Sequence, residues 1–164
     1  MKFNFKGRWI ALLALMTIAG CASSGGSRSE RTTYQEDLGR LLAGPLDDVR
    51  LEMFNRHSVG LARNEVTTRS ILYESLWMPR DVTQGEVLNG VIGARNRVVI
   101  RGRMIEQGLE PSANVFRVTF IVENQIRTET TVEWHPGPLP DPALERFREL
   151  LSDMKLELNT GVRR

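Results

Sequence analysis

The residue types that most often catalyse reactions or bind metals are scarce in this sequence. Its histidines are His57 and His135, which lie far apart and in no ligand-spaced motif, and Cys21 is its single cysteine. A metal site needs several such ligands converging on one ion. The G-x-S-x-G turn of many serine nucleophiles is absent, and the glycines of GEVLNGVIG match neither a phosphate-binding loop nor a dinucleotide fingerprint. We therefore predict no metal, no cofactor and no catalytic site.

Asp47 and Asp48 form a pair of adjacent carboxylates. Two acids can supply the proton donor and the nucleophile of a glycoside hydrolase. Adjacent acids at the start of a helix more commonly complement the helix dipole. An envelope enzyme acting on cell-wall material is therefore kept as the alternative to a non-enzymatic protein.

Five arginines give the clearest candidate for a binding site. They fall on the odd positions of two predicted strands and therefore on one face of a sheet: Arg95, Arg97, Arg101, Arg103 and Arg117. Three glutamates share that predicted face: Glu123, Glu129 and Glu133. One interpretation is a solvated ladder of ion pairs, each contributing only tenths of a kcal/mol. The other is a face that binds an anionic partner through its guanidinium groups, such as an acidic protein surface or a phosphorylated envelope glycan or lipid.

The two strands that carry these arginines are predicted to pair as a hairpin. Residues 96–106 and 114–124 both have apolar or small side chains at even positions. One register keeps these on a single face, with Met104 opposite Phe116, Gly102 opposite Val118, Ile100 opposite Phe120 and Val98 opposite Val122. The same register places Arg97 opposite Glu123, and a one-residue slip would mix the two faces. A third strand over 127–134 would extend the apolar face, with Val132 opposite Val118 and Trp134 opposite Phe116.

Weaker signals precede this hairpin. Thr33 and Glu36 fit a capping box for a short helix, which Gly44 and Pro45 would end. Segment 46–61 fits both a helix and a strand, and we favour a helix. Segment 66–78 is rich in β-branched and aromatic residues, which predicts a strand.

Two more helices are predicted from clearer signals. Thr83 and Glu86 form a second capping-box pattern, for a helical turn through about Ile92. Asp141 and Pro142 suit the cap and first position of a last helix, whose apolar stripe consists of Leu144, Phe147, Leu150, Leu151, Met154 and Leu158. The predicted fold class is α+β: an antiparallel sheet of three or four strands packed against N- and C-terminal helices.

The beginning of the chain has the composition of a signal peptide. Residues 1–8 contain three cations and no anion, and residues 9–19 form an uninterrupted apolar run. That run is shorter than the roughly 20 apolar residues a membrane-spanning helix needs. The run ends at Ile18, Ala19, Gly20 and Cys21. We predict that residues 1–20 are a leader removed from the mature protein.

The four residues Ile18-Ala19-Gly20-Cys21 resemble the lipobox of bacterial lipoprotein precursors. The resemblance implies that Ile18, Ala19 and Gly20 are recognised by the lipoprotein signal peptidase, that cleavage precedes Cys21, and that Cys21 carries diacylglycerol. Ala22 stands where many inner-membrane lipoproteins have Asp. If the source has two membranes, the resemblance therefore implies that the protein is anchored in the outer membrane and faces the periplasm. Two or three acyl chains would anchor the protein stably, at roughly 0.8 kcal/mol per buried methylene.

The mature chain is predicted to be a tether followed by one domain. Residues 21–32 are rich in Ser and Gly, as in a flexible linker, and residues 33–164 have the length of a single α+β domain. Removing the leader leaves 19 basic against 20 acidic residues, which does not favour nucleic-acid binding. We expect a lipid-anchored envelope protein with a non-enzymatic binding or scaffolding domain. A small apolar ligand carrier, with a deep cavity between helix and sheet, is a further alternative.

Overall fold

Two long strands form the centre of the structure: β5 (Val91–Glu106) and β6 (Val115–Thr128). The computed structural model describes residues 31–161, so the leader, the lipobox and most of the tether lie outside the described residues. The predicted register is confirmed, with Met104 opposite Phe116, Val98 opposite Val122 and Arg97 opposite Glu123. The alternation of apolar and polar residues is local, and only one register puts all apolar side chains on the same face.

The sheet is larger than predicted. It has seven antiparallel strands among the described residues, in the order β1-β6-β5-β3-β2, with β4 beside β5 and β7 beside β6. The prediction of an α+β fold is confirmed, whereas the prediction of three or four strands is wrong. The additional strands are β1 (Thr33–Leu42), β2 (Leu61–Val66), β3 (Ser70–Ser75), β4 (Met78–Arg80) and β7 (His135–Pro136).

The helix predicted from Thr33 is a strand, β1, and the first helix follows it. Tyr34, Leu38 and Leu41 all pack against the core, and their spacing of three to four residues resembles that of a helix face. A bulge between Asp37 and Gly39 produces this spacing, because the extra residue shifts the alternation of an extended strand. Gly39 takes a φ of +87°, which glycine adopts without a Cβ penalty.

β1 also takes the place that was predicted for a third strand over 127–134. It pairs with β6 from Thr33 opposite Glu123 to Leu42 opposite Val115. The predicted pairing of Val132 with Val118 and of Trp134 with Phe116 is therefore wrong, and only His135 and Pro136 return to β6, at its other end. The single strand predicted over 66–78 is instead a hairpin of β2 and β3, followed by β4.

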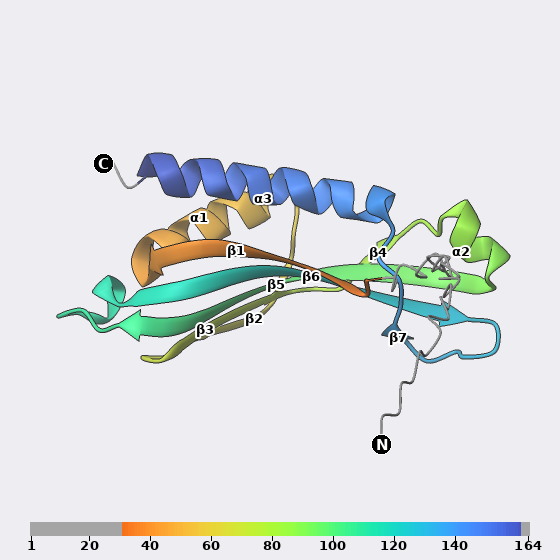
Figure 1. Ribbon diagram of the computed structural model, residues 1–164, viewed down its shortest axis with the longest axis horizontal. Coiled ribbons are helices and arrows are strands. Elements are labelled where there is room, and N and C mark those ends of the chain that lie inside the picture. The colour runs from red at the N-terminus through yellow and green to blue at the C-terminus, as the bar shows by residue number, and fades with distance from the viewer. Residues whose placement is uncertain (1–30, 162–164) are drawn as a thin grey trace, which may run out of the picture.

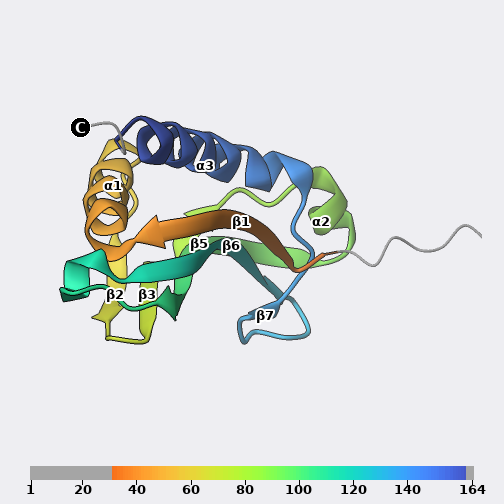
Figure 2. The same ribbon diagram turned by 60° about the vertical axis from the view of Figure 1, so that its left-hand side comes forward.

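Helices cover one face of the sheet (Figures 1 and 2). α1 (Ala43–Arg56) corresponds to the favoured helix over 46–61, and Gly44 and Pro45 lie in its first turn rather than ending a preceding helix. The predicted stripe of α3 (Asp141–Gly161) is buried along its whole length, from Leu144 to Leu158. These helices pack on Val98, Ile100, Phe116, Val118, Phe120 and Val122. None of the helices within residues 31–161 is long and apolar enough to cross a membrane.

The predicted second capping box is present, at the start of α2 (Gln84–Leu88). The Thr83 hydroxyl accepts a hydrogen bond from the Glu86 amide, and the Glu86 carboxylate accepts one from the Thr83 amide. Arg80 donates to the same carboxylate and to the Asn124 side chain, which ties α2 to β4 and β6. This network fixes α2 at one end of the sheet.

Candidate functional site

The structure places all five predicted arginines on the same face of the sheet. Their cross-strand partners follow from the register of β5 and β6, and this face lies opposite the one that α1 and α3 cover. We call it the open face. Its strands carry eight arginines against five carboxylates, a surplus of three positive charges: Arg40, Arg63, Arg95, Arg97, Arg101, Arg103, Arg117 and Arg127 against Asp37, Glu65, Glu74, Glu106 and Glu123. Glu129 and Glu133, predicted on this face, lie in the segment between β6 and β7.

Three arginines form a row across the strands. Arg40 on β1 is the partner of Arg117 on β6, which in turn is the partner of Arg103 on β5. We call these residues the arginine row. Like charges placed directly opposite one another destabilise a sheet. The direct pairing of these arginines therefore opposes the stability of the sheet, unless other groups offset their charge.

Neighbouring carboxylates offset part of the charge of the row. Asp37 accepts hydrogen bonds from Arg117, the shortest 2.7 Å long, and Glu106 accepts one of 2.7 Å from Arg40. The guanidinium of Arg117 and the amide of Gly39 hold the pKa of Asp37 below its ordinary value. Arg103 is exposed and forms no salt bridge with any residue in the range 31–161.

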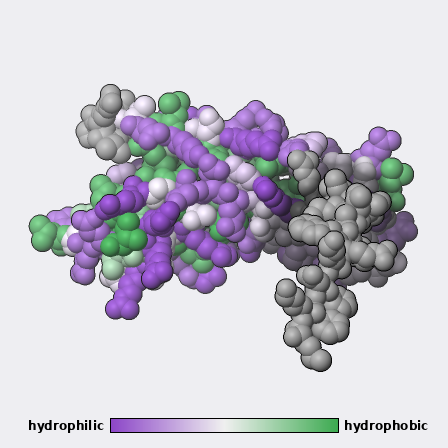
Figure 3. Space-filling view, in the orientation of Figure 1, coloured by the Kyte–Doolittle hydropathy of each residue, from purple (hydrophilic) through white to green (hydrophobic). Residues whose placement is uncertain are grey.

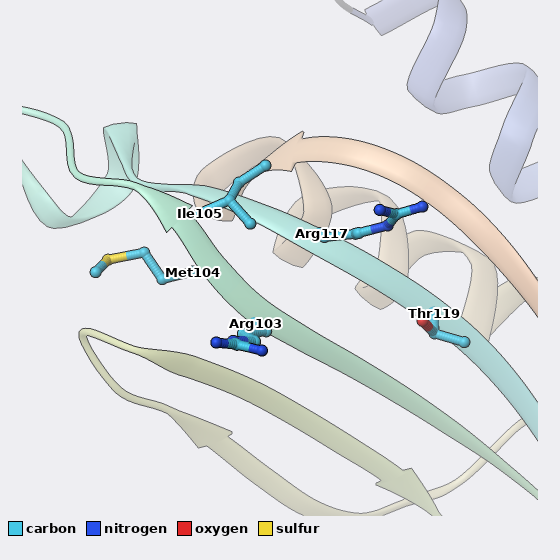
Figure 4. A pocket seen from close by; sticks show the side chains of 5 residues that line it. All are labelled: Arg103, Met104, Ile105, Arg117 and Thr119. Carbon is cyan, nitrogen blue, oxygen red and sulfur yellow. The ribbon is translucent and has the colours of Figure 1, made fainter.

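A shallow depression lies beside the row (Figure 4). It has a volume of about 560 Å³ and is lined by Arg103, Met104, Ile105, Arg117 and Thr119. In Figure 4 the Arg117 side chain extends toward β1, whereas Arg103 lies on the side of the β2–β3 hairpin. Guanidinium and hydroxyl donors next to apolar side chains can hold an anionic group that has an apolar portion.

At the other end of the open face, arginines and tryptophans alternate in a stack. The Arg95 guanidinium lies 4.7 Å from the centre of the Trp77 ring and 4.3 Å from that of Trp134. Arg97 lies 4.7 Å from the Trp77 ring, and Arg127 lies 5.1 Å from that of Trp134. These distances are within the range of cation–π attraction. We call the five side chains the Arg–Trp stack.

Arg95 is the centre of the stack and is held there by its neighbours. Its Nε and Nη2 atoms donate to the Gln125 side-chain oxygen at 2.9 and 2.6 Å. Partial burial, with a contribution from Arg97, lowers the pKa of Arg95 from its ordinary value. The stack therefore fixes a cation that has no salt bridge to a described residue.

The predicted ion-pair ladder is also present, and in the middle of the open face it centres on Arg97. Arg97 donates to Glu123 at 2.7 Å and to Glu74 at 3.3 Å. Arg101 lies 3.9 Å from the same Glu123 carboxylate and is mostly exposed. The two interpretations of the arginines thus apply to different residues, because Arg97 is neutralised while Arg95 and Arg103 are not.

Sequence reasoning missed the Arg–Trp stack. Trp134 was expected on the apolar face, and Trp77 was expected inside a strand. In the structure, Trp77 lies between β3 and β4, and Trp134 directly precedes β7. Both residues are therefore outside regular strands, where periodicity indicates no direction for a side chain.

The histidines and paired acids lie away from the open face or on its margin. His57, just after α1, lies 2.9 Å from Asp153 on α3, and the His135 ring lies 3.1 Å from the Glu133 carbonyl oxygen. Asp47 pairs with the buried Arg50, so it belongs to the packing of α1. Within residues 31–161, no three His, Cys, Asp or Glu side chains are grouped so that they could hold a metal ion.

Comparison with known proteins gives little further information. No protein-family model and no curated protein matches the chain. One solved structure with a similar course of the chain is the uncharacterized conserved protein YugN from Geobacillus kaustophilus HTA426. It is 16% identical, the match covers 76% of this chain and 90% of that one, and the TM-score is 0.44. A likeness of that strength assigns no function.

Proposed function

We propose that the chain is a lipid-anchored protein of the cell envelope whose open face binds an anionic envelope component. The anchor is inferred from the resemblance of Ile18-Ala19-Gly20-Cys21 to a lipobox, with lipid on Cys21. The binding role is inferred from the open face. The protein would act as a non-enzymatic binder or scaffold at the membrane that carries it.

The observation that carries the binding role is the arginine row. Arg40, Arg117 and Arg103 are paired with one another across three strands although like charges oppose this. An anion that receives hydrogen bonds from two of them would relieve the repulsion and gain charge-assisted bonds. We expect a row of this kind where the side chains have been selected for binding a partner rather than for the stability of the sheet.

The Arg–Trp stack supports the same role at the other end of the face. Arg95 and Arg103 are eight residues apart on β5, which corresponds to about 26 Å at the rise of a strand. Two cationic positions at that separation suit an extended anionic surface better than a single small ion. Because Arg95 is already held in place, little side-chain entropy is lost when a partner contacts it.

Affinity capture of the native lipoprotein from detergent-solubilised membranes tests the binding role. Arg101→Ser with Arg103→Ser removes two exposed charges from the open face and should reduce the recovery of bound partner. Recovery by the unaltered protein should also fall as salt is raised, because exposed charges are screened.

The matched control removes two arginines from the opposite side of the molecule. Arg146 and Arg148 lie on α3, and replacing both with Ser changes the net charge by the same amount. This control should recover the partner as well as the unaltered protein does. Equal recovery by the open-face variant and the control would reject the open face as the binding surface.

The anchor is tested separately. A Cys21→Ser variant should lose the acyl chains from the mature N-terminus, which mass spectrometry detects, and should leave the membrane fraction. If this variant stays membrane-bound after removal of its leader, the attachment has another source.

A further inference from the structure

α2 presents large apolar side chains to solvent at one tip of the molecule. Leu88 is 82% exposed, Val87 is 58% exposed, and Ile92, the second residue of β5, is 48% exposed. Figure 3 shows a hydrophobic patch at the tip where α2 lies in Figure 1. We call these three residues the α2 tip.

The α2 tip cannot turn its side chains inward, because the opposite side of the helix is held. Glu86 is buried and its carboxylate bonds to Arg80 and to Thr83. The residues that follow Glu86 in a helix point away from it, by about 100° per residue. Val87 and Leu88 are therefore fixed toward the outside of the molecule. The salt bridge with Arg80 also leaves no net charge on α2 itself.

The described chain begins nearer to this tip than to the opposite end of the sheet. Arg31 lines the same groove as Thr83, Gly85, Glu86 and Asn89, which belong to α2 and its cap. Ten residue steps separate Arg31 from Cys21, which allows a separation of at most about 35 Å. A lipid on Cys21 would therefore keep the start of the domain within that distance of the bilayer surface.

The opposite end of the sheet lies farther from the point where the tether joins the domain. Thr33 is opposite Glu123, which is opposite Arg97, so the domain begins level with the first half of β5. The start of β5, next to α2, is six residue steps from Arg97, or about 20 Å, whereas its end at Glu106 is nine steps away, or about 30 Å. Leu109 lies beyond that end and is fully exposed. Of the two apolar ends of the molecule, the α2 tip is the one nearer to the attachment of the tether.

We propose that the α2 tip docks into the headgroup and acyl boundary of the bilayer that carries the lipid on Cys21. This inference rests on the proposed lipid anchor. Three apolar side chains would bind a bilayer only weakly by themselves, but a tether turns their binding into an intramolecular step at high effective concentration. Docking at this end directs β5 and β6 away from the membrane and holds the arginine row at the distal end of the molecule, where a partner can reach it.

Site-specific labelling of the acylated protein in vesicles tests the proposal. Because acylation consumes the Cys21 thiol, Leu88→Cys and Leu109→Cys each provide a single reactive thiol. Each variant is labelled with a fluorophore and reconstituted into phosphatidylethanolamine and phosphatidylglycerol vesicles that contain lipids with a nitroxide on the acyl chain. Both positions are highly exposed, so neither change should impair folding, and Leu109 serves as the matched control.

The label at position 88 should be quenched and should report a depth of roughly 5–10 Å, as for apolar faces at a bilayer interface. The label at position 109 should not be quenched. Absence of quenching at both positions in protein whose acylation is verified by mass overturns docking and leaves the anchor intact. Equal quenching at both positions means that the molecule lies flat and also overturns the proposal. A mature protein without acyl chains contradicts the anchor itself, and the docking proposal is rejected with it.

Discussion

Replacing Arg95 with Met tests how the Arg–Trp stack is held together. Met keeps most of the apolar stem but removes two cation–π contacts, at about 0.5–1 kcal/mol each. It also removes the hydrogen bonds to Gln125, which contribute about 1 kcal/mol. Relief of the partial burial of the charge offsets some of this loss. We therefore expect the free energy of unfolding to fall by about 2 kcal/mol.

Urea unfolding of the mature domain measures this change, with Arg103→Met as the matched control. Arg103 is exposed, so its replacement should change the free energy of unfolding by less than about 0.5 kcal/mol. Trp77 and Trp134 are the only tryptophans once the leader with Trp9 is removed, so intrinsic fluorescence reports on the stack alone. Their emission should move to longer wavelength in Arg95→Met. Equal stabilities of the two variants, with unchanged emission, would refute the account of the stack.

Two further predictions concern the fold that carries the site. Burial raises the pKa of Glu86, but hydrogen bonds from Arg80 and Thr83 outweigh this effect and hold that pKa below its ordinary value of 4.5. The ionised Glu86 side chain therefore contributes stability above pH 4.5, and this contribution is lost as the pH falls through the lower pKa of the folded state. Arg80→Met should cost about 3 kcal/mol at neutral pH, because the Glu86 carboxylate stays buried without its cation. Loss of Arg80 should also raise the pKa of Glu86 from its value in the unaltered protein, so the deficit in stability should shrink on acidification. Urea unfolding at neutral and acidic pH measures this, and a deficit that stayed constant would contradict it. Gly102→Val should cost about 1–3 kcal/mol in thermal unfolding, since a Cβ there would lie 3.2 Å from the Ile71 Cβ and 3.3 Å from the Phe116 Cβ. An unchanged melting temperature would show that these side chains on the neighbouring strands can shift to make room.

The α2 end of the sheet shows which contacts a local sequence pattern predicts and which it does not. The capping box of Thr83 and Glu86 was predicted from four consecutive residues and is present, because both of its hydrogen bonds lie within the helix. The attachment of Glu86 to Arg80, and of Arg80 to Asn124, joins three elements. Its partners are distant along the chain, so no local pattern indicates it.

The sequence by itself determined the register of β5 and β6, the common face of the five arginines and the buried stripe of α3. Each of these depends on the periodicity of one element or one short connection. Only the tertiary structure decided that β1 rather than residues 127–134 lies beside β6, that Arg40 completes the arginine row, and that Trp77 and Trp134 enclose Arg95. Periodicity says which face a side chain takes, whereas the neighbour of a strand depends on free energies summed over contacts between distant segments. The arginines of the site were therefore visible in the sequence, and their neighbours were not.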